Sequence, residues 1–217
     1  MGFLPLPSLL SLASTCTRLH CIFDDPSLWR TIELDPIPSK VGLHQESYRN
    51  MLEDKGKHAR KMIFKYKGYL GGPPGCPKWL ALKSAMELCG NNLTSLTVGY
   101  ISIEDLGMVS DSCKTLTSLS VGHCLFKRSA GEDLSNDWKP GFAVARKFKQ
   151  LEHFAGDFNW RRVGMSLKTV TIFLKELIIS NISLKRVAIG GVSLIRLATW
   201  DSLGTLQRCH IIILLEG

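Results

Sequence analysis

The stretch Cys113-Lys-Thr-Leu116-Thr-Ser-Leu119-Ser-Val121-Gly-His-Cys124-Leu-Phe126 places apolar side chains in the pattern Leu-x-x-Leu-x-Leu. A copy lies 23 residues upstream, in Leu93-Thr-Ser-Leu96-Thr-Val98-Gly-Tyr-Ile101-Ser-Ile103, and it shares the same Leu-Thr-Ser-Leu core. Alternating apolar residues over so short a run predict a strand with one buried face. Two copies at a fixed spacing therefore predict a repeated unit with one strand each.

The spacing of apolar residues resembles the leucine-rich repeat, L-x-x-L-x-L-x-x-N/C-x-L, with Cys124 in the polar slot and Ile101 in that slot of the upstream copy. One such unit cannot bury its own apolar side, whereas stacked units form an array. The resemblance implies an α/β solenoid whose short parallel strands line a concave face and whose helices lie outside. Concave arrays of this kind suit the binding of another macromolecule.

Further units are expected on both sides of this pair. A degenerate first strand is predicted at 59–64, 34 residues before the Leu93 copy, and a third unit at Leu151–Asn159. A fourth is predicted at Leu174–Ile179, but Leu184–Ile189 fits the template too and begins only ten residues later, so one of these two frames must be false. Later strand candidates are Leu194–Leu197 and Ile211–Leu215, and the bare apolar end predicts truncation there.

The segments between the strands predict outer helices. Apolar residues recur at helical spacing in 79–88 and in 103–113, and a polar helix over 45–57 is expected to bury Tyr48, Met51 and Leu52. The residues near 127–148 are polar and rich in turn formers, which predicts a loop insertion into the array. Insertions in repeat arrays cluster on one face and often bind partners.

The N-terminal residues form a second informative segment. Pro5 and Pro7 suit a helix start that Ser8 can cap. One apolar face is then predicted to run through Leu9, Leu10, Leu12, Ala13, Cys16, Leu19 and either Ile22 or Phe23. Asp24-Asp25-Pro26 ends this helix, and Ser27-Leu28-Trp29 predicts a turn that packs the indole back on it.

This wording, Leu-Pro-Leu-Pro-Ser-Leu-Leu at 4–10 and Asp-Asp-Pro-Ser-Leu-Trp at 24–29, resembles the second half of an F-box. The F-box is the helical motif that docks on the Skp-type adaptor of cullin-based ubiquitin ligases. The resemblance implies adaptor contacts through Pro5, Leu9, Leu10 and Leu12. An F-box usually opens with a Leu-Pro-x-Glu helix, and the sequence begins after that point, so we expect an incomplete gene product or a weakened adaptor interaction. The alternative is an amphipathic hairpin that packs on the array.

Composition narrows the class of protein. The 217 residues are 45% hydrophobic and 21% charged, which is typical of a folded chain, and the net charge of +8 favours acidic partners. Seven cysteines without a C-x-x-C pair predict reduced thiols, with those at 89, 113 and 124 buried. We find no secretory signal and no apolar run of about 18 residues, so we expect no membrane span and a cytoplasmic or nuclear location.

Catalytic chemistry is not expected. The six histidines are scattered, the acidic pairs are adjacent in sequence, and no pattern indicates a metal or a cofactor. The run Lys55–Lys67 holds six Lys or Arg residues that alternate with aromatic ones, which leaves nucleic-acid binding as an alternative to a solvated strand face.

The sequence thus predicts three regions, namely a partial F-box-like segment at 1–34, a linker with a polar helix at 35–58, and a leucine-rich-repeat array at 59–217. The resemblance implies a non-catalytic substrate-recognition subunit of a Skp–cullin–F-box ubiquitin ligase, whose partners are the Skp-type adaptor, the cullin complex and a target protein that the sequence does not name. The alternative function is a repeat scaffold that binds protein without the ligase.

Overall fold

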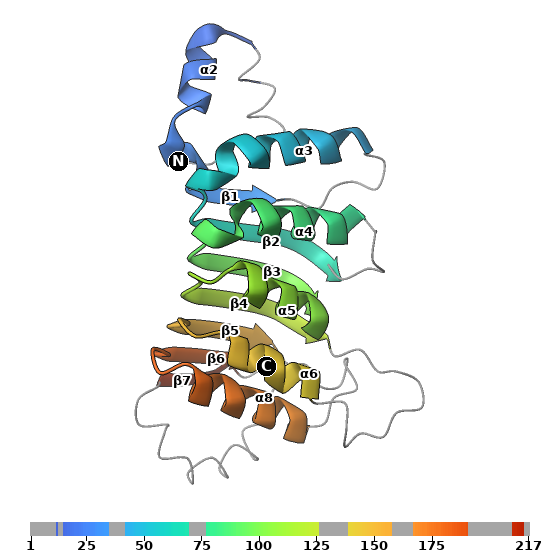
Figure 1. The fold of residues 1–217 in the computed structure, drawn as a ribbon, viewed down its shortest axis with the longest axis vertical. Coiled ribbons are helices and arrows are strands. Elements are labelled where there is room, and N and C mark those ends of the chain that lie inside the picture. The colour runs from blue at the N-terminus through green and yellow to red at the C-terminus, as the bar shows by residue number, and fades with distance from the viewer. Residues whose placement is uncertain are drawn as a thin grey trace.

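The computed structural model describes residue 12 and residues 15–34, 42–69, 77–125, 139–157, 167–190 and 210–214. Strands and helices alternate along this part of the chain (Figure 1). The elements are α2 (Thr17–Phe23), η1 (Pro26–Trp29), β1 (Thr31–Leu34), α3 (Gly42–Lys55), η2 (Gly56–His58), β2 (Lys61–Tyr69), α4 (Pro77–Cys89), η3 (Gly90–Asn92), β3 (Ser95–Ser102), α5 (Ile103–Ser112), β4 (Ser118–Leu125), α6 (Lys139–Lys147), β5 (His153–Asp157), α8 (Leu167–Ser180), β6 (Arg186–Gly190) and β7 (His210–Leu214).

The strands form one seven-stranded parallel sheet in which each strand pairs with the next one along the chain. Leu96 pairs with Leu119, and Val98 pairs with Val121. This confirms the register that the 23-residue copy predicts. The mixed α/β class with short parallel strands is therefore confirmed for the described residues.

Helices α3, α4, α5, α6 and α8 lie on the same face of the sheet (Figure 1). Strand side chains that point toward these helices are buried, and those that point the other way are exposed or half-buried. The buried side chains align across the sheet in two rows, which are Ile32, Met62, Leu96, Leu119, Phe154 and Val187, and Leu34, Phe64, Val98, Val121 and Ile189. The core thus runs continuously along the sheet between the strands and the helices.

A repeated backbone contact precedes the strands. The carbonyl of Thr94 accepts hydrogen bonds from the N–H groups of Thr117 and Ser118, both at 2.9 Å. The same two-donor contact recurs at the carbonyls of Arg30, Arg60, Thr117 and Glu152. Five successive junctions with one geometry mean that the units are structurally equivalent, although their lengths in sequence differ.

The sheet begins before the predicted boundary of the array. Thr31–Leu34 pairs with β2 from Lys61 to Phe64, so it forms the first strand of the sheet although it lies in the N-terminal segment. The predicted start at residue 59 is thus too late. The strand at 59–64 is confirmed as β2, but it is the second in the sheet. The strand has only four residues, and the alternate burial of Ile32 and Leu34 is its only strand-like pattern in the sequence.

The predicted fourth strand at Leu174–Ile179 is wrong, because these residues lie in helix α8. The competing prediction, a strand at Leu184–Ile189, is the correct one, because Val187 and Ile189 lie in β6 and pair with β5. Leu174 and Leu177 are buried on the helix face, and a Leu-x-x-Leu spacing serves a helix as well as a strand. Ile211 pairs with Val187 in β7, whereas the candidate at 194–197 lies outside the described residues.

The predicted insertion near 127–148 is partly wrong, because Lys139–Lys147 forms the outer helix α6. Its buried side chains, Val144 and Ala145, pack in the core beside α5 and α8. The outer helices predicted at 79–88 and 103–113 are confirmed as α4 and α5. Ser102 caps α5 by accepting a hydrogen bond from the N–H of Asp105.

The polar helix is confirmed as α3, with Met51 and Leu52 buried. The side chain of Tyr48 lies outside the described residues.

The single long helix predicted from Ser8 to Phe23 is interrupted. Cys16 is extended, with φ of −159°, and α2 begins only at Thr17. The side-chain oxygen and the N–H of Thr15 both donate to the carbonyl of Leu12, which closes a turn just before the break. Hydroxyl side chains compete for backbone groups in this way, and the run Ser14-Thr15-Cys16-Thr17 is rich in them.

Candidate functional site

Exposed apolar side chains mark the N-terminal segment. Among the described residues, five large hydrophobic side chains are exposed, and three of them are here: Leu12 at 39%, Ile22 at 53% and Leu28 at 39%. Of the four predicted contact residues, Leu12 is exposed, while Pro5, Leu9 and Leu10 lie outside the described residues. The helical pattern did not distinguish Ile22 from Phe23, and the structure leaves Ile22 in solvent.

Phe23 and Trp29 fix the shape of this segment. The indole Nε1 of Trp29 donates to the carbonyl of Phe23 at 2.6 Å, and the two rings meet edge to face with centroids 4.7 Å apart. Trp29 is buried in the core that continues under β1. Asp25 caps η1 through the N–H of Ser27. The predicted turn that packs an indole back on the helix is therefore confirmed.

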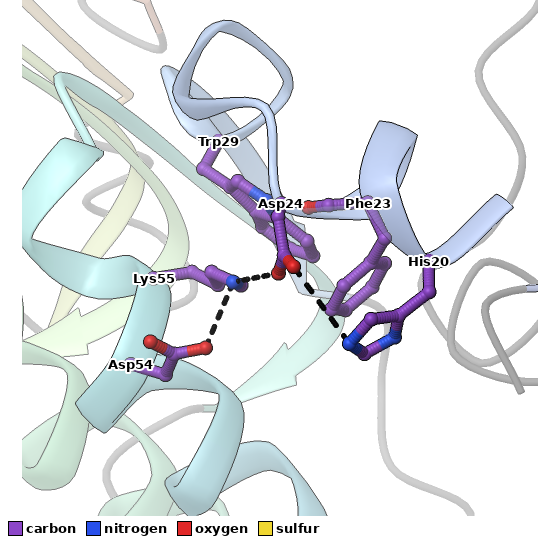
Figure 2. A network of polar contacts seen from close by, with 6 residues as sticks. All are labelled: His20, Phe23, Asp24, Trp29, Asp54 and Lys55. Carbon is purple, nitrogen blue, oxygen red and sulfur yellow. Dashed lines mark hydrogen bonds and ion pairs between the residues drawn. The ribbon is translucent and has the colours of Figure 1, made fainter. Parts of the chain in front are cut away.

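Lys55 ties the N-terminal segment to the end of helix α3. Its ammonium donates to Asp24 at 2.5 Å and pairs with Asp54 at 2.8 Å, although its side chain is only 10% exposed (Figure 2). The same ammonium lies 5.5 Å from the centre of the Phe23 ring, within range of a cation–π contact. Sequence reasoning missed this residue, because its partner Asp24 is 31 positions away.

The charges in this contact stabilise one another. The hydrogen bond to Asp24 raises the pKa of Lys55 above its ordinary value, and the same bond lowers the pKa of Asp24. The exposed side chain of His20 places its Nε2 3.7 Å from Oδ2 of Asp24 (Figure 2). Because the ammonium is nearly buried, its two carboxylate partners are needed to offset the cost of removing its charge from water. The contact therefore fixes α2 against α3.

The described side chains of the basic run Lys55–Lys67 have different surroundings. Lys55 is occupied by carboxylates, and Phe64 is buried in the core. Lys61 is exposed on the face of β2 that is turned away from the helices. Phe64 and Lys61 therefore lie on opposite faces of the sheet, while the side chains of Lys65, Tyr66 and Lys67 lie outside the described residues.

The buried cysteines have the inert character that the sequence predicts. Burial raises the pKa of Cys89 to about 11 and that of Cys113 to about 12, and the thiol of Cys113 donates to the sulfur of Met86. The side chain of Cys124 lies outside the described residues. No cluster of potential metal ligands occurs in the residues with described positions, and none of the helices there is long and apolar enough to cross a bilayer.

Comparison with known proteins bears on the N-terminal segment alone. No curated protein matches the chain. The family model described as F-box-like matches residues 1–35, which include Leu12, Ile22, Leu28 and the Phe23–Trp29 contact. The N-terminal segment is therefore similar to an F-box.

Proposed function

We propose that this protein is the substrate-recognition subunit of a Skp–cullin–F-box ubiquitin ligase. The observation that carries the proposal is the F-box-like match at residues 1–35, in the same segment that exposes Leu12, Ile22 and Leu28. These three side chains, together with Pro5, Leu9 and Leu10, are the proposed contacts to the Skp-type adaptor. Apolar side chains held outward on a small folded segment lower their free energy when a partner covers them.

The rest of the chain is proposed to be a leucine-rich-repeat array that binds the target protein. Two observations support this: the strands follow one another in parallel, and the same carbonyl contact recurs at five successive junctions. Because helices cover one face, the opposite face of the sheet offers its side chains to a partner (Figure 1). Stacked repeats bind macromolecules through such extended faces.

The contact at Lys55 holds the N-terminal segment in a fixed position relative to the sheet. It joins α2 to α3, and β1 joins the same segment to the sheet, so the adaptor surface and the target surface belong to one packed body. A target bound to the array is then held at a defined place relative to the ubiquitin-charged enzyme that the cullin brings. In this proposal the protein positions the target and does not itself transfer ubiquitin. It acts in the cytoplasm or the nucleus.

Point variants in an adaptor-binding titration test the proposal. Leu12→Asp places a charge in the proposed contact, and we expect adaptor affinity to fall at least about tenfold, because a desolvated carboxylate replaces buried apolar area. The matched control is Ile182→Asp, which makes the same change at an exposed position ahead of β6, and it should leave the affinity unchanged.

A chain extended before Met1 by a generic Leu-Pro-x-Glu helix provides a second measurement. The added helix should raise adaptor affinity, because it enlarges the apolar contact by roughly 25 cal/mol for each Å² buried, before the entropy of association is subtracted. A chain that is folded by circular dichroism and binds no adaptor, with or without this helix, would contradict the ligase assignment. That result would leave only the protein-binding scaffold.

A further inference from the structure

A strip of side chains runs across the sheet where its strands start. The register places Thr31, Lys61, Ser95, Ser118, His153 and Arg186 side by side on successive strands from β1 to β6. We define the strand-start strip as these six residues and the residue before each of them, which adds Arg30, Arg60, Thr94, Thr117, Glu152 and Lys185.

Positive charge dominates the two ends of the strip. Arg30, Arg60 and Lys61 lie at the β1–β2 end, and Lys185 and Arg186 lie at the β6 end, all of them exposed. The one acidic residue of the strip is Glu152, and Lys185 neutralises it at 2.8 Å. Between the ends, β3 and β4 contribute only the hydroxyl side chains of Thr94, Ser95, Thr117 and Ser118.

The backbone of the strip is already occupied. The carbonyls of Arg30, Arg60, Thr94, Thr117 and Glu152 each accept hydrogen bonds from two backbone N–H groups of the next unit. A partner that crosses the strip must therefore bind through its own side chains to the basic and hydroxyl side chains, and it cannot add a strand here. Carboxylates are suited to this role, since they accept hydrogen bonds from Arg and Lys and from the hydroxyl groups of Ser95 and Ser118. The hydroxyl groups of Thr94 and Thr117 already donate to the carbonyls of Arg60 and Thr94.

We propose that the strand-start strip binds an extended acidic segment of the target protein, with two groups of Asp or Glu residues separated by about six residues. The spacing follows from the sheet. Four strand intervals of about 4.8 Å separate Lys61 on β2 from Arg186 on β6, which gives about 19 Å. An extended chain covers about 3.3 Å per residue, so about six residues join the two basic ends. This inference deepens the proposed function, because it presumes that the array receives the target.

A protein segment fits the strip better than a nucleic acid does. Single-stranded nucleic acids bind where aromatic side chains stack on bases along a basic groove. Among the side chains of the strip, His153 is the only ring, and the nearby aromatic residues Phe64 and Trp29 are buried on the other side of the sheet. The two basic ends with a polar, uncharged middle also match two separated acidic groups better than a continuous line of phosphates.

The test uses the full chain and fluorescein-labelled peptides that carry two Glu-Glu pairs. Ser-Gly linkers set the pairs two, six or twelve residues apart, and we expect the two-residue spacing to bind most weakly, because it cannot span the roughly 19 Å between the basic ends, which both longer linkers can. Lys61→Glu and Arg186→Glu should each weaken the binding of the peptide with the six-residue linker about three- to tenfold at about 0.1 M salt. Lys175→Glu, an exposed lysine on α8 with the same change of charge, is the matched control and should change it less than about twofold.

Three results would overturn the inference. The first is that no spacing of the acidic peptide binds to a folded chain that still binds the adaptor. The second is that the control variant weakens binding as much as the two strip variants do. The third is tighter binding of a phosphoserine peptide or a 12-nucleotide single strand than of the Glu peptide, with the same sensitivity to Lys61→Glu. Adaptor binding, measured on the same variants, reports separately on the proposed function and should not change.

Discussion

Gly122 on β4 lies against the backbone of Gly99 on β3, so replacing it tests the register of the sheet. A Cβ at this position would stand 2.5 Å from the carbonyl oxygen of Gly99 and 3.2 Å from its carbonyl carbon. Carbon–oxygen contacts between neighbouring strands are ordinarily about 3.3 Å or longer, so Gly122→Ala forces a local shift approaching about 1 Å. The atom in the way belongs to the backbone, which cannot turn aside as a side chain could.

We expect Gly122→Ala to cost about 1–3 kcal/mol of unfolding free energy, as other overpacking substitutions do. For a chain of this length, about 2 kcal/mol lowers the Tm by roughly 4–8 °C. The assay is thermal unfolding followed by circular dichroism. Gly107→Ala in α5 is the control, because its added Cβ meets only the Cγ2 of Val144, at 3.3 Å, and alanine favours a helix. A Gly122→Ala variant that melts at or above the wild-type temperature would refute the close approach of the two strands.

Three further substitutions or measurements test the contacts described above. Lys55→Met keeps the apolar stem and removes the charge, so the Tm should fall by about 2–5 °C near pH 7. This difference should shrink as the pH falls through the lowered pKa of Asp24, because the protonated carboxyl no longer pairs and only Asp54 remains, and a constant difference would argue against the contact. Cys89 and Cys113, with pKa values of about 11 and 12, should resist a thiol reagent at pH 8 in the folded chain and react after unfolding, and fast reaction in the folded chain would contradict their burial. Asn181→Ala removes a buried side-chain amide whose oxygen accepts a hydrogen bond from the N–H of Leu151 at 3.2 Å. Urea unfolding should show that the free energy of unfolding falls by about 1–3 kcal/mol, and an unchanged midpoint would contradict this role.

The parts of the fold that the sequence predicts are those in which one pattern has one structural meaning. Leu96 and Leu119 lie in strands that also contain valine and glycine at matching positions, so both the period and the register can be deduced. Leu174 and Leu177 lack that support, because the same two-leucine spacing fits the face of a helix, and the helix α8 forms there. Ile32 and Leu34 are too short a run to outweigh the helical motif beside them.

The candidate site divides in the same way. The turn at Trp29 is local, so Asp24-Asp25-Pro26 and the following aromatic residue predict it directly. The contact between Lys55 and Asp24 depends on how α3 packs against the N-terminal segment, which no local pattern contains. A lysine within a basic run is ordinarily solvated, and its burial here follows from tertiary packing alone. The exposure of Ile22 has the same origin, since it is the neighbouring Phe23 that packs against Trp29.

The most direct test of the account is a calorimetric titration of the full chain with a Skp-type adaptor bound to the N-terminal part of a cullin. The account predicts saturable binding of one chain to one adaptor, with a heat capacity change that is clearly negative because the contact buries apolar surface. The Leu12→Asp variant should bind the complex at least about tenfold more weakly. A chain that melts cooperatively in the same buffer but gives no binding heat at several temperatures, and does not co-migrate with the complex on gel filtration, would contradict the account.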